Sequence, residues 1–155
     1  MKVKDIMTRD VITLSPDMSV KESMEKLFKL HISGLPVVDE NKKVIGMFTE
    51  KNLIRLTLPN YVEQAGEFVF LMDIEGFDKK SSELEKIKVR DAMRKEVICV
   101  DEDTPFVEVA RIMITKGVRR IPVLNKDGTL VGIVAREDIV KQIMEKCGGV
   151  DKDAC

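Results

Sequence analysis

The stretch Val3-Lys-Asp-Ile-Met7 returns 86 residues later as Val89-Arg-Asp-Ala-Met93, and Leu35-Pro-Val-Val38 returns at the same offset as Ile121-Pro-Val-Leu124. The offset holds without a gap through both copies, and many of the pairs that differ exchange one apolar residue for another. Self-similarity at one fixed period is typical of a duplicated structural unit. The sequence therefore predicts a chain built from two copies of one small fold.

Length and charge narrow the class of protein. The chain has 155 residues and a formal net charge of −1, with no strongly basic stretch. This balance does not favour a nucleic-acid or anionic-membrane surface. No apolar run approaches the ~20 residues of a membrane helix, and the start lacks the apolar stretch of a secretory signal. We therefore expect a cytoplasmic protein that binds neither membrane nor nucleic acid.

The first copy contains a recognisable order of elements. A β-branched run at 11–14 predicts a strand, and Ser19 with Glu22 has the capping-box spacing that opens an amphipathic helix to about His31. Two apolar runs, 35–39 and 44–48, predict a β-hairpin. Thr49 can then cap a second helix that runs through Leu58.

The second copy repeats this order. It predicts a strand at 97–100, a helix at 105–116 behind an Asp103/Thr104 cap and ended by Gly117, a hairpin at 121–134 and a helix at 136–146. Each copy is a β-α-β-β-α unit, so the predicted fold class is α+β. The expected boundaries are 1–58 for the first copy, 59–88 for a connector, 89–147 for the second copy and 148–155 for a flexible tail.

Two other parts of the sequence allow less specific predictions. The connector holds the densest aromatic run, Phe68-Val-Phe-Leu-Met72, which is either a segment packed over the core or an exposed apolar flap for a partner. The three cysteines have no metal-ligand spacing. Cys99 is expected to pack as a small hydrophobe in a strand, and Cys155 to be a free thiol in the tail.

The sequence carries no enzymatic constellation. The single histidine, His31, lies at a predicted helix end, where a capping or structural role is favoured over catalysis. No nucleophile elbow, Walker loop or dinucleotide fingerprint is present. We therefore expect no catalytic residue, no metal site and no required cofactor.

One feature recurs at both strand-to-helix junctions: Gly46-Met-Phe-Thr-Glu-Lys-Asn52 and Gly132-Ile-Val-Ala-Arg-Glu-Asp138. A helix N-terminus presents unpaired N–H groups to a phosphate, and glycine permits close approach of the backbone. An ionised aspartate can accept hydrogen bonds from both hydroxyls of a ribose. Each junction is thus suited to a sugar phosphate, although Thr49 and Asp138 would also stabilise their helices without a ligand.

Taken together, these motifs resemble those of a tandem cystathionine-β-synthase (CBS) domain pair, also called a Bateman module. Both copies show a D-x-M lead, an h-P-V-h segment and a G-h-h-x-x-x-[DN] junction, over nearly all of residues 1–146. The resemblance implies two CBS repeats packed through their sheets as a pseudo-twofold disc. It also implies two clefts between the repeats, often occupied by AMP, ADP, ATP or S-adenosylmethionine.

The resemblance assigns residues to each implied cleft. In the better cleft, Asp138 would hold the ribose and Arg119 and Arg120 the phosphate, with Ala135 in place of the family's serine or threonine. Its remaining wall would come from Ile12, Ile32, Ser33, Gly34 and Ile133. The second cleft would use Thr49, Asn52, Ile98, Val118, Arg119 and Arg120. We rank it second because Asn52 lacks the acid and Ser33-Gly34 stand where the other copy has arginines.

These observations predict a non-catalytic sensor: a stand-alone module that binds an adenine nucleotide and modulates an unidentified partner protein. The first alternative is a structural or dimerisation module with vestigial sites. The others are an enzyme with an unrecognised site and a regulatory piece of a larger protein, the latter disfavoured by the methionine start. A homodimer is expected, because the last helix would expose Ile139, Val140, Ile143 and Met144.

Overall fold

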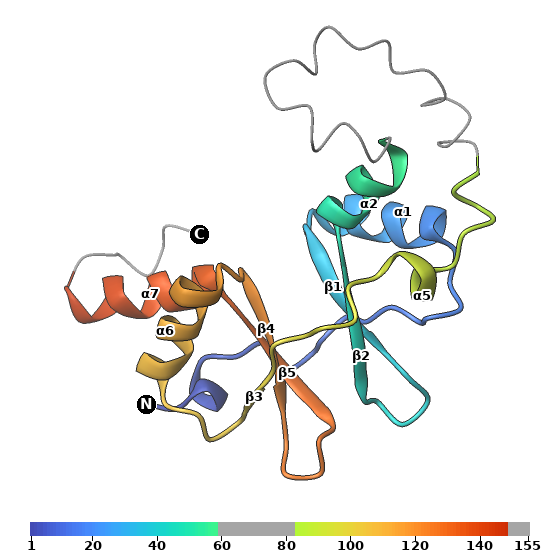
Figure 1. Cartoon of the computed structure of the whole chain (residues 1–155). Helices are drawn as coiled ribbons and strands as arrows, with labels where there is room; N and C mark the ends of the chain where they lie inside the picture. Colours follow the sequence, from blue (N-terminus) through green and yellow to red (C-terminus); the bar gives the residue numbers. More distant parts are fainter. Residues whose placement is uncertain (59–82, 149–155) are drawn as a thin grey trace, which may run out of the picture. The chain divides into compact units, whose positions relative to one another are not determined.

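The computed structural model of the chain describes residues 1–58 and 83–148 (Figure 1). Most of the predicted connector and nearly all of the predicted tail lie outside the described residues. The aromatic run at 68–72 and Cys155 lie outside them as well. The two interpretations of the connector therefore stay predictions.

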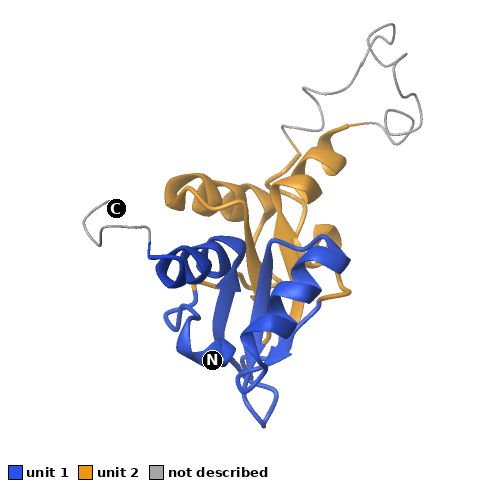
Figure 2. Ribbon diagram, turned by 90° about the vertical axis from the view of Figure 1, so that its left-hand side faces the viewer, with its two compact units in different colours: residues 1–11, 41–44, 98–155 blue, residues 12–40, 45–97 orange. Residues whose placement is uncertain are grey.

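The chain divides into two compact units that do not coincide with the two repeats (Figure 2). Unit 1 comprises residues 1–11, 41–44 and 98–155, and unit 2 comprises residues 12–40 and 45–97. We call residues 1–11 leader 1 and residues 87–97 leader 2. Leader 1 belongs to the unit that carries the second repeat, and leader 2 to the unit that carries the first.

Unit 2 contains most of the first repeat. Its elements are α1 (Val20–Leu30), β1 (Gly34–Val38), β2 (Val44–Thr49), α2 (Glu50–Thr57) and, from leader 2, α5 (Val89–Ala92). Strands β1 and β2 form a two-stranded sheet. The predicted helix caps are confirmed, because Ser19 Oγ accepts from Glu22 N at 3.1 Å and Thr49 caps α2. His31 is the C-cap of α1, which confirms the predicted capping role.

Unit 1 contains leader 1 and most of the second repeat. Its elements are the 3-10 helix η1 (Val3–Asp5), β3 (Val100–Asp101), α6 (Phe106–Lys116), β4 (Arg120–Leu124), β5 (Leu130–Ala135) and α7 (Arg136–Lys146). The sheet order is β3-β4-β5, with β3 parallel to β4 and β4 antiparallel to β5. Helices α6 and α7 pack against each other (Figure 1). Gly117 ends α6 in the left-handed region at φ 64°, as the sequence predicts.

Each unit has its own hydrophobic core, and each core includes residues of the leader. Val3 and Val89 are fully buried. Val3 joins the unit 1 cluster with Val109, Ile121, Val123 and Val134, while Val89 joins the unit 2 cluster with Leu14, Val20, Val37 and Phe48. The apolar positions of the D-x-M leads are thus core positions, so burial of these side chains is what holds the leaders in place.

Several predicted elements differ from the structure. The predicted strand at 11–14 is a single parallel bridge between Leu14 and Val37, and the strand predicted at 97–100 is β3 at Val100–Asp101. The predicted Asp103/Thr104 cap of α6 is wrong, because the N-cap is Pro105 and has no side-chain cap hydrogen bond. Ile139 is buried rather than exposed, since it faces the core of unit 1.

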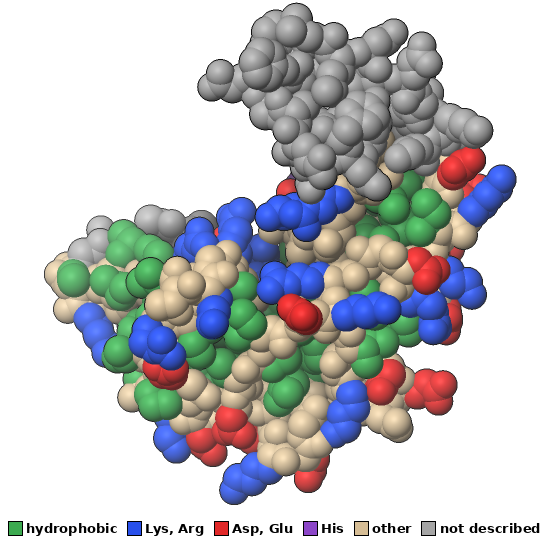
Figure 3. Space-filling model, viewed as in Figure 1, with side chains coloured by type: hydrophobic (Ala, Val, Ile, Leu, Met, Phe, Trp, Pro, Cys, Tyr) green, Lys and Arg blue, Asp and Glu red, His purple; other side chains and the backbone are tan. Residues whose placement is uncertain are grey.

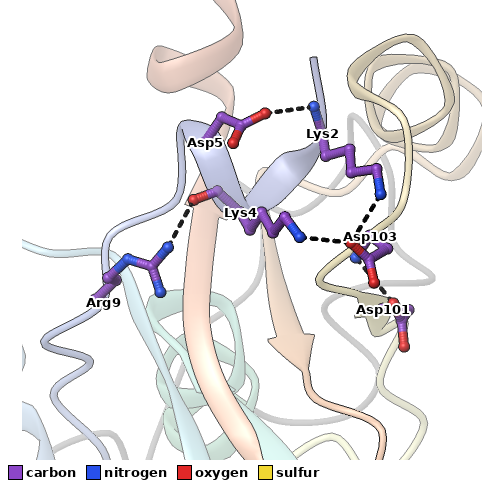
Figure 4. A network of polar contacts seen from close by, with 6 residues as sticks. All are labelled: Lys2, Lys4, Asp5, Arg9, Asp101 and Asp103. Atoms are coloured by element: carbon purple, nitrogen blue, oxygen red, sulfur yellow. Dashed lines mark hydrogen bonds and ion pairs between the residues drawn. The ribbon is translucent and has the colours of Figure 1, made fainter.

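Asp103 instead holds leader 1 to the loop after β3 (Figure 4). Its carboxylate accepts from Lys4 Nζ at 2.7 Å and from Lys2 Nζ at 3.0 Å. The hydrogen bond from Lys4, followed by that from Lys2, lowers the pKa of Asp103 to about 2. Exposed ion pairs contribute little to stability. The network therefore supplements the burial of Val3 rather than replacing it.

The α+β fold with two β-α-β-β-α repeats is confirmed. The sequence did not predict that the leader of each repeat belongs to the unit that carries most of the other repeat. This exchange decides which residues border each strand-to-helix junction.

Candidate functional site

The β5–α7 junction of unit 1 brings together four of the predicted site residues. Arg120 and Ala135 are paired across the β4–β5 ladder. Arg136 N, the first amide of α7, donates to Arg119 O at 2.9 Å. Ala135 N donates to Asp138 Oδ2 at 2.7 Å, so the carboxylate is held at the start of the helix. The start of β4, the end of β5 and the start of α7 thus carry Arg119, Arg120, Ala135 and Asp138.

This junction has the donors and acceptors that a sugar phosphate requires. Asp138 is half-buried, and its second oxygen, Oδ1, accepts no hydrogen bond from the described residues. Arg119 is exposed and forms no ion pair with any residue of the described ranges. A carboxylate oxygen can accept from a ribose hydroxyl, and a guanidinium fork suits a phosphate. The N-terminus of α7 adds a positive dipole end.

Leader 1 borders the same junction, which the sequence did not predict. Thr8 and Ile133 form an antiparallel bridge in which each N–H donates to the other's carbonyl at 2.9 Å. Ile133 lies two residues before Ala135 in β5. Leader 1 is thus hydrogen-bonded to the strand that delivers the candidate site. The D-x-M motif signals a buried methionine, but not the strand on which it packs.

The corresponding junction of unit 2 has the same backbone and different side chains. Glu50 N donates to Ser33 O at 2.9 Å, as Arg136 N does to Arg119 O. Thr49 N donates to Asn52 Oδ1 at 2.9 Å, and Thr49 Oγ1 lies 3.1 Å from the same oxygen. This junction therefore presents Gly34, Thr49 and Asn52 where unit 1 presents Arg120, Ala135 and Asp138.

The remaining predicted residues divide between the units. Ile12 is exposed in unit 2, where Ile32 is half-buried and packs against the core and Gly34 opens β1. In unit 1, Val118 packs against the core and Ile98 precedes β3. Each predicted cleft combines residues of both units. The structure thus brings together the residues of each predicted cleft that belong to one unit. The combination of residues from both units in one cleft stays a prediction.

Other reactive groups lie apart from the junctions. Cys99 is half-buried, and this burial raises the pKa of its thiol above the ordinary value, which keeps it protonated. In residues 1–58 and 83–148, no three side chains among His, Cys, Asp and Glu gather where a metal could bind. Within the same ranges, no helix combines the length and the apolar character needed to cross a bilayer.

Comparison with known proteins identifies relatives for nearly the whole chain. The inosine-5'-monophosphate dehydrogenase of Methanocaldococcus jannaschii is 30% identical over 141 residues, which is 91% of this chain. The match spans only 23% of that enzyme's length.

Two solved structures with bound ligands are also similar. CBSX2 of Arabidopsis thaliana in complex with AMP is 26% identical with a TM-score of 0.73, over 94% of this chain and 98% of that one. The CBS domain pair of protein MJ0100 in complex with 5'-methylthioadenosine and S-adenosyl-L-methionine is 27% identical with a TM-score of 0.70, over 94% and 98%.

The match to a known family covers both repeats. The CBS domain description fits residues 3–58 and 89–145, and together these ranges exceed half of the chain. Each range starts in one leader and extends through the candidate junction, to the C-cap of α2 in the first repeat and into α7 in the second. The chain therefore belongs to the CBS domain family and carries two CBS domains.

Proposed function

We propose that this chain is a non-catalytic regulatory module that binds an adenine nucleotide at the β5–α7 junction of unit 1 and thereby changes its contacts with another protein. The observation that carries the proposal is the convergence of Arg119, Arg120 and Asp138 on one helix start. Ligand-bound relatives support it, because AMP is bound by CBSX2 and S-adenosylmethionine by MJ0100.

In this proposal each residue has a separate task. Asp138 accepts from the ribose hydroxyls through the oxygen that does not hold Ala135 N. Arg119 and Arg120 bind the phosphate. Ile133 lies two residues before Ala135 in the same strand, where it can pack beside the bound ligand. These groups bind and orient a ligand without performing chemistry on it.

Ala135 lowers the expected affinity of this site without abolishing binding. A serine or threonine would supply one more hydroxyl to the ligand. A single neutral hydrogen bond is worth about 0.5–1.5 kcal/mol, which is at most roughly tenfold in affinity. The Thr49/Asn52 junction of unit 2 keeps the hydroxyl but has Asn52 in the place of Asp138 and Gly34 in the place of Arg120, so we propose it as the weaker site.

Regulation follows from differential binding. A nucleotide that binds one arrangement of the protein more tightly than another shifts the population towards the first. The module then presents a different surface to the partner protein. Binding itself also stabilises the folded state, by about 2.7 kcal/mol at a ligand concentration one hundred times the Kd.

Isothermal titration of ligand-free protein with AMP, ATP and S-adenosylmethionine tests the proposal. Asp138→Asn is the sharpest variant, because an amide oxygen can still accept from Ala135 N, as Asn52 Oδ1 does from Thr49 N. The helix start is thus kept while the charge and one acceptor are lost. A hydrogen bond to a charged group is worth roughly 1.5–3 kcal/mol, so affinity should fall roughly tenfold to a hundredfold.

Asp127→Asn is the matched control, because it makes the same charge change in the exposed β4–β5 turn of the same unit. It should bind nucleotide like the unchanged protein. Absence of heat with all three ligands at millimolar concentration would overturn the proposal. Equal losses in both variants would show that overall charge, rather than the junction, governs binding.

A second candidate function is a structural or dimerisation module, and one observation favours it. Unit 1 exposes apolar side chains along α6 and α7, where hydrophobic side chains reach the surface in Figure 3. They are Val107, Ile114, Val140, Ile143 and Met144. Exposed apolar side chains on two packed helices are typical of an interface. We propose that this face forms a homodimer, with or without a nucleotide at the junction.

Sedimentation of Ile143→Glu tests the dimer. A charge at the centre of the face should yield monomers, while Lys141→Glu, an exposed charge change on the same helix, should not. If nucleotide left both the melting temperature and the dimer unchanged, the structural function would replace the sensing one.

A further inference from the structure

The cap of α2 in unit 2 fixes the direction of one methyl group. Thr49 Oγ1 lies 3.1 Å from Asn52 Oδ1 and 3.4 Å from Asn52 N, so the hydroxyl is turned towards the helix start. The hydroxyl and the methyl of threonine share Cβ, and threonine has few χ1 rotamers. Holding the hydroxyl at the helix therefore directs Cγ2 elsewhere. In this structure Cγ2 is directed at Gly34.

Gly34 leaves no room for a side chain while Thr49 keeps this rotamer. A Cβ built on Gly34 would lie 2.8 Å from Thr49 Cγ2 and 3.2 Å from the carbonyl oxygen of Phe48. Non-bonded carbon atoms prefer about 3.5–4.0 Å. The methyl could turn away only if the hydroxyl left the helix cap. A threonine cap and a side chain at the facing strand position thus exclude each other.

The junction of unit 1 has the same backbone arrangement but the opposite pair of residues: a side chain at the strand position and no methyl group to oppose it at the cap position. Its junction has the same hydrogen bond, Arg136 N to Arg119 O at 2.9 Å, so the strand and helix meet in the same register. The position of Gly34 is taken by Arg120, and that of Thr49 by Ala135, its partner across the ladder. Alanine has no Cγ, and this leaves space for the Cβ of Arg120.

The loss of the threonine cap is offset at the same place. Asp138 accepts from Ala135 N at 2.7 Å, whereas the neutral Asn52 accepts from Thr49 N at 2.9 Å. A hydrogen bond to an ionised acceptor is stronger than one to an amide. Asp138 therefore holds the start of α7 without help from a hydroxyl, so alanine is tolerated at position 135.

From this geometry we infer that Ala135 is a specificity-determining residue. By giving space to Arg120 it makes the unit 1 junction select phosphate-bearing adenosine ligands. Thr49 with Gly34 makes the unit 2 junction select adenosine ligands without a phosphate. The inference rests on the proposed function, which requires only that the unit 1 junction binds a nucleotide. It adds the reason why the two junctions differ in the class of ligand.

The first test compares AMP with adenosine by isothermal titration. In the unchanged protein, the charge-assisted contacts of the phosphate should make AMP bind about tenfold or more tightly than adenosine. Ala135→Thr restores the methyl and should reduce this ratio to within about twofold, because Arg120 is displaced. Ala135→Ser is the matched control, since it adds the hydroxyl without the methyl, and it should keep the high ratio. A high ratio in Ala135→Thr would overturn the inference.

The second test needs no ligand and works in unit 2. Gly34→Ala should lower the melting temperature by roughly 5 °C, as overpacking of a tight site does. In a Thr49→Ser background, which keeps the capping hydroxyl and removes the methyl, the same Gly34→Ala change should cost less than half as much. Equal costs in the two backgrounds would refute the steric exclusion.

The two tests separate the two proposals. If neither AMP nor adenosine binds, the proposed function fails, and the ligand selectivity fails with it. The melting experiment still decides whether the cap methyl and the facing side chain exclude each other. If AMP and adenosine bind with equal affinity to the unchanged protein, nucleotide binding by the module stands, while the phosphate role of Arg119 and Arg120 and the inference fail.

Discussion

Gly132→Ala should loosen leader 1 from unit 1, although it adds only one methyl group. The backbone of Gly132 is ordinary strand, with no positive φ that would require glycine. The added Cβ would lie 2.8 Å from Met7 Cγ, closer still to Met7 Sδ, and 3.1 Å from the carbonyl oxygen of Thr8. Met7 is buried, so its side chain has little space to move into. The backbone at Thr8 is held by two hydrogen bonds to Ile133.

The expected cost follows from these contacts. Without a clash, alanine in place of glycine would stabilise the strand by about 0.4–1 kcal/mol through the unfolded state. Overpacking of a filled site costs about 1–3 kcal/mol, and complete loss of the Met7 side chain from the core would cost about 2–5 kcal/mol. We expect a net destabilisation of about 2 kcal/mol. For a chain of this size that is a fall of roughly 4–8 °C in melting temperature.

Urea unfolding followed by circular dichroism measures the effect. The equivalent Gly46→Ala in unit 2 should behave alike, because its Cβ would lie 2.9 Å from Met93 Cγ and 3.0 Å from Arg94 O. In a Met7→Ala background, the Gly132→Ala change should cost less than half as much, since the opposing side chain is gone and only the contact with the Thr8 carbonyl oxygen at 3.1 Å remains. A Gly132→Ala protein as stable as the unchanged one would refute the reasoning that Met7 on Gly132 holds the leader.

Two further predictions concern the helix end and the ion pair described above. His31→Gly should stabilise the protein by about 1 kcal/mol in thermal unfolding, because His31 holds the left-handed C-cap at φ 53° that Gly117 fills in the second repeat at φ 64°. The pKa of Asp103 is lowered from 3.8 to about 2 by Lys4 and Lys2, so its stabilising effect is complete above pH 4 and is lost as the pH falls towards 2. Urea midpoints measured from pH 5 to pH 2 should fall more for the unchanged protein than for Asp103→Asn, and high salt should reduce the difference.

The local elements were predictable because their signals lie within a few residues of each other. Ser19 and Thr49 cap the helices that their spacing predicts, and Gly117 ends α6. Asp103 failed as a cap because a partner distant in sequence, Lys4, binds its carboxylate. Such competition between a local and a distant partner cannot be read from spacing.

The exchange of leaders could not be predicted for a related reason. Both leaders carry the same D-x-M pattern, and both second hairpin strands carry the receiving glycine, Gly46 or Gly132. Met7 would fit either glycine equally well by sequence. The choice depends on the path of the chain between repeats, so it appears only in the structure, where Met7 packs on Gly132 and Met93 on Gly46.

At the candidate site, the sequence shows which residues differ between the repeats but not how these differences depend on each other. The differences Gly34 to Arg120 and Thr49 to Ala135 are visible in the sequence, where Ala135 indicates only a lost hydroxyl. The rotamer of Thr49 shows that the two differences depend on each other, because the Thr49 methyl occupies the space that the Cβ of an arginine at position 34 would need. A single threonine introduced at position 135 would therefore remove more binding energy through Arg120 than its hydroxyl could return. In a duplicated protein, the loss of a side-chain group in one copy can thus be what allows a larger functional side chain at the neighbouring position.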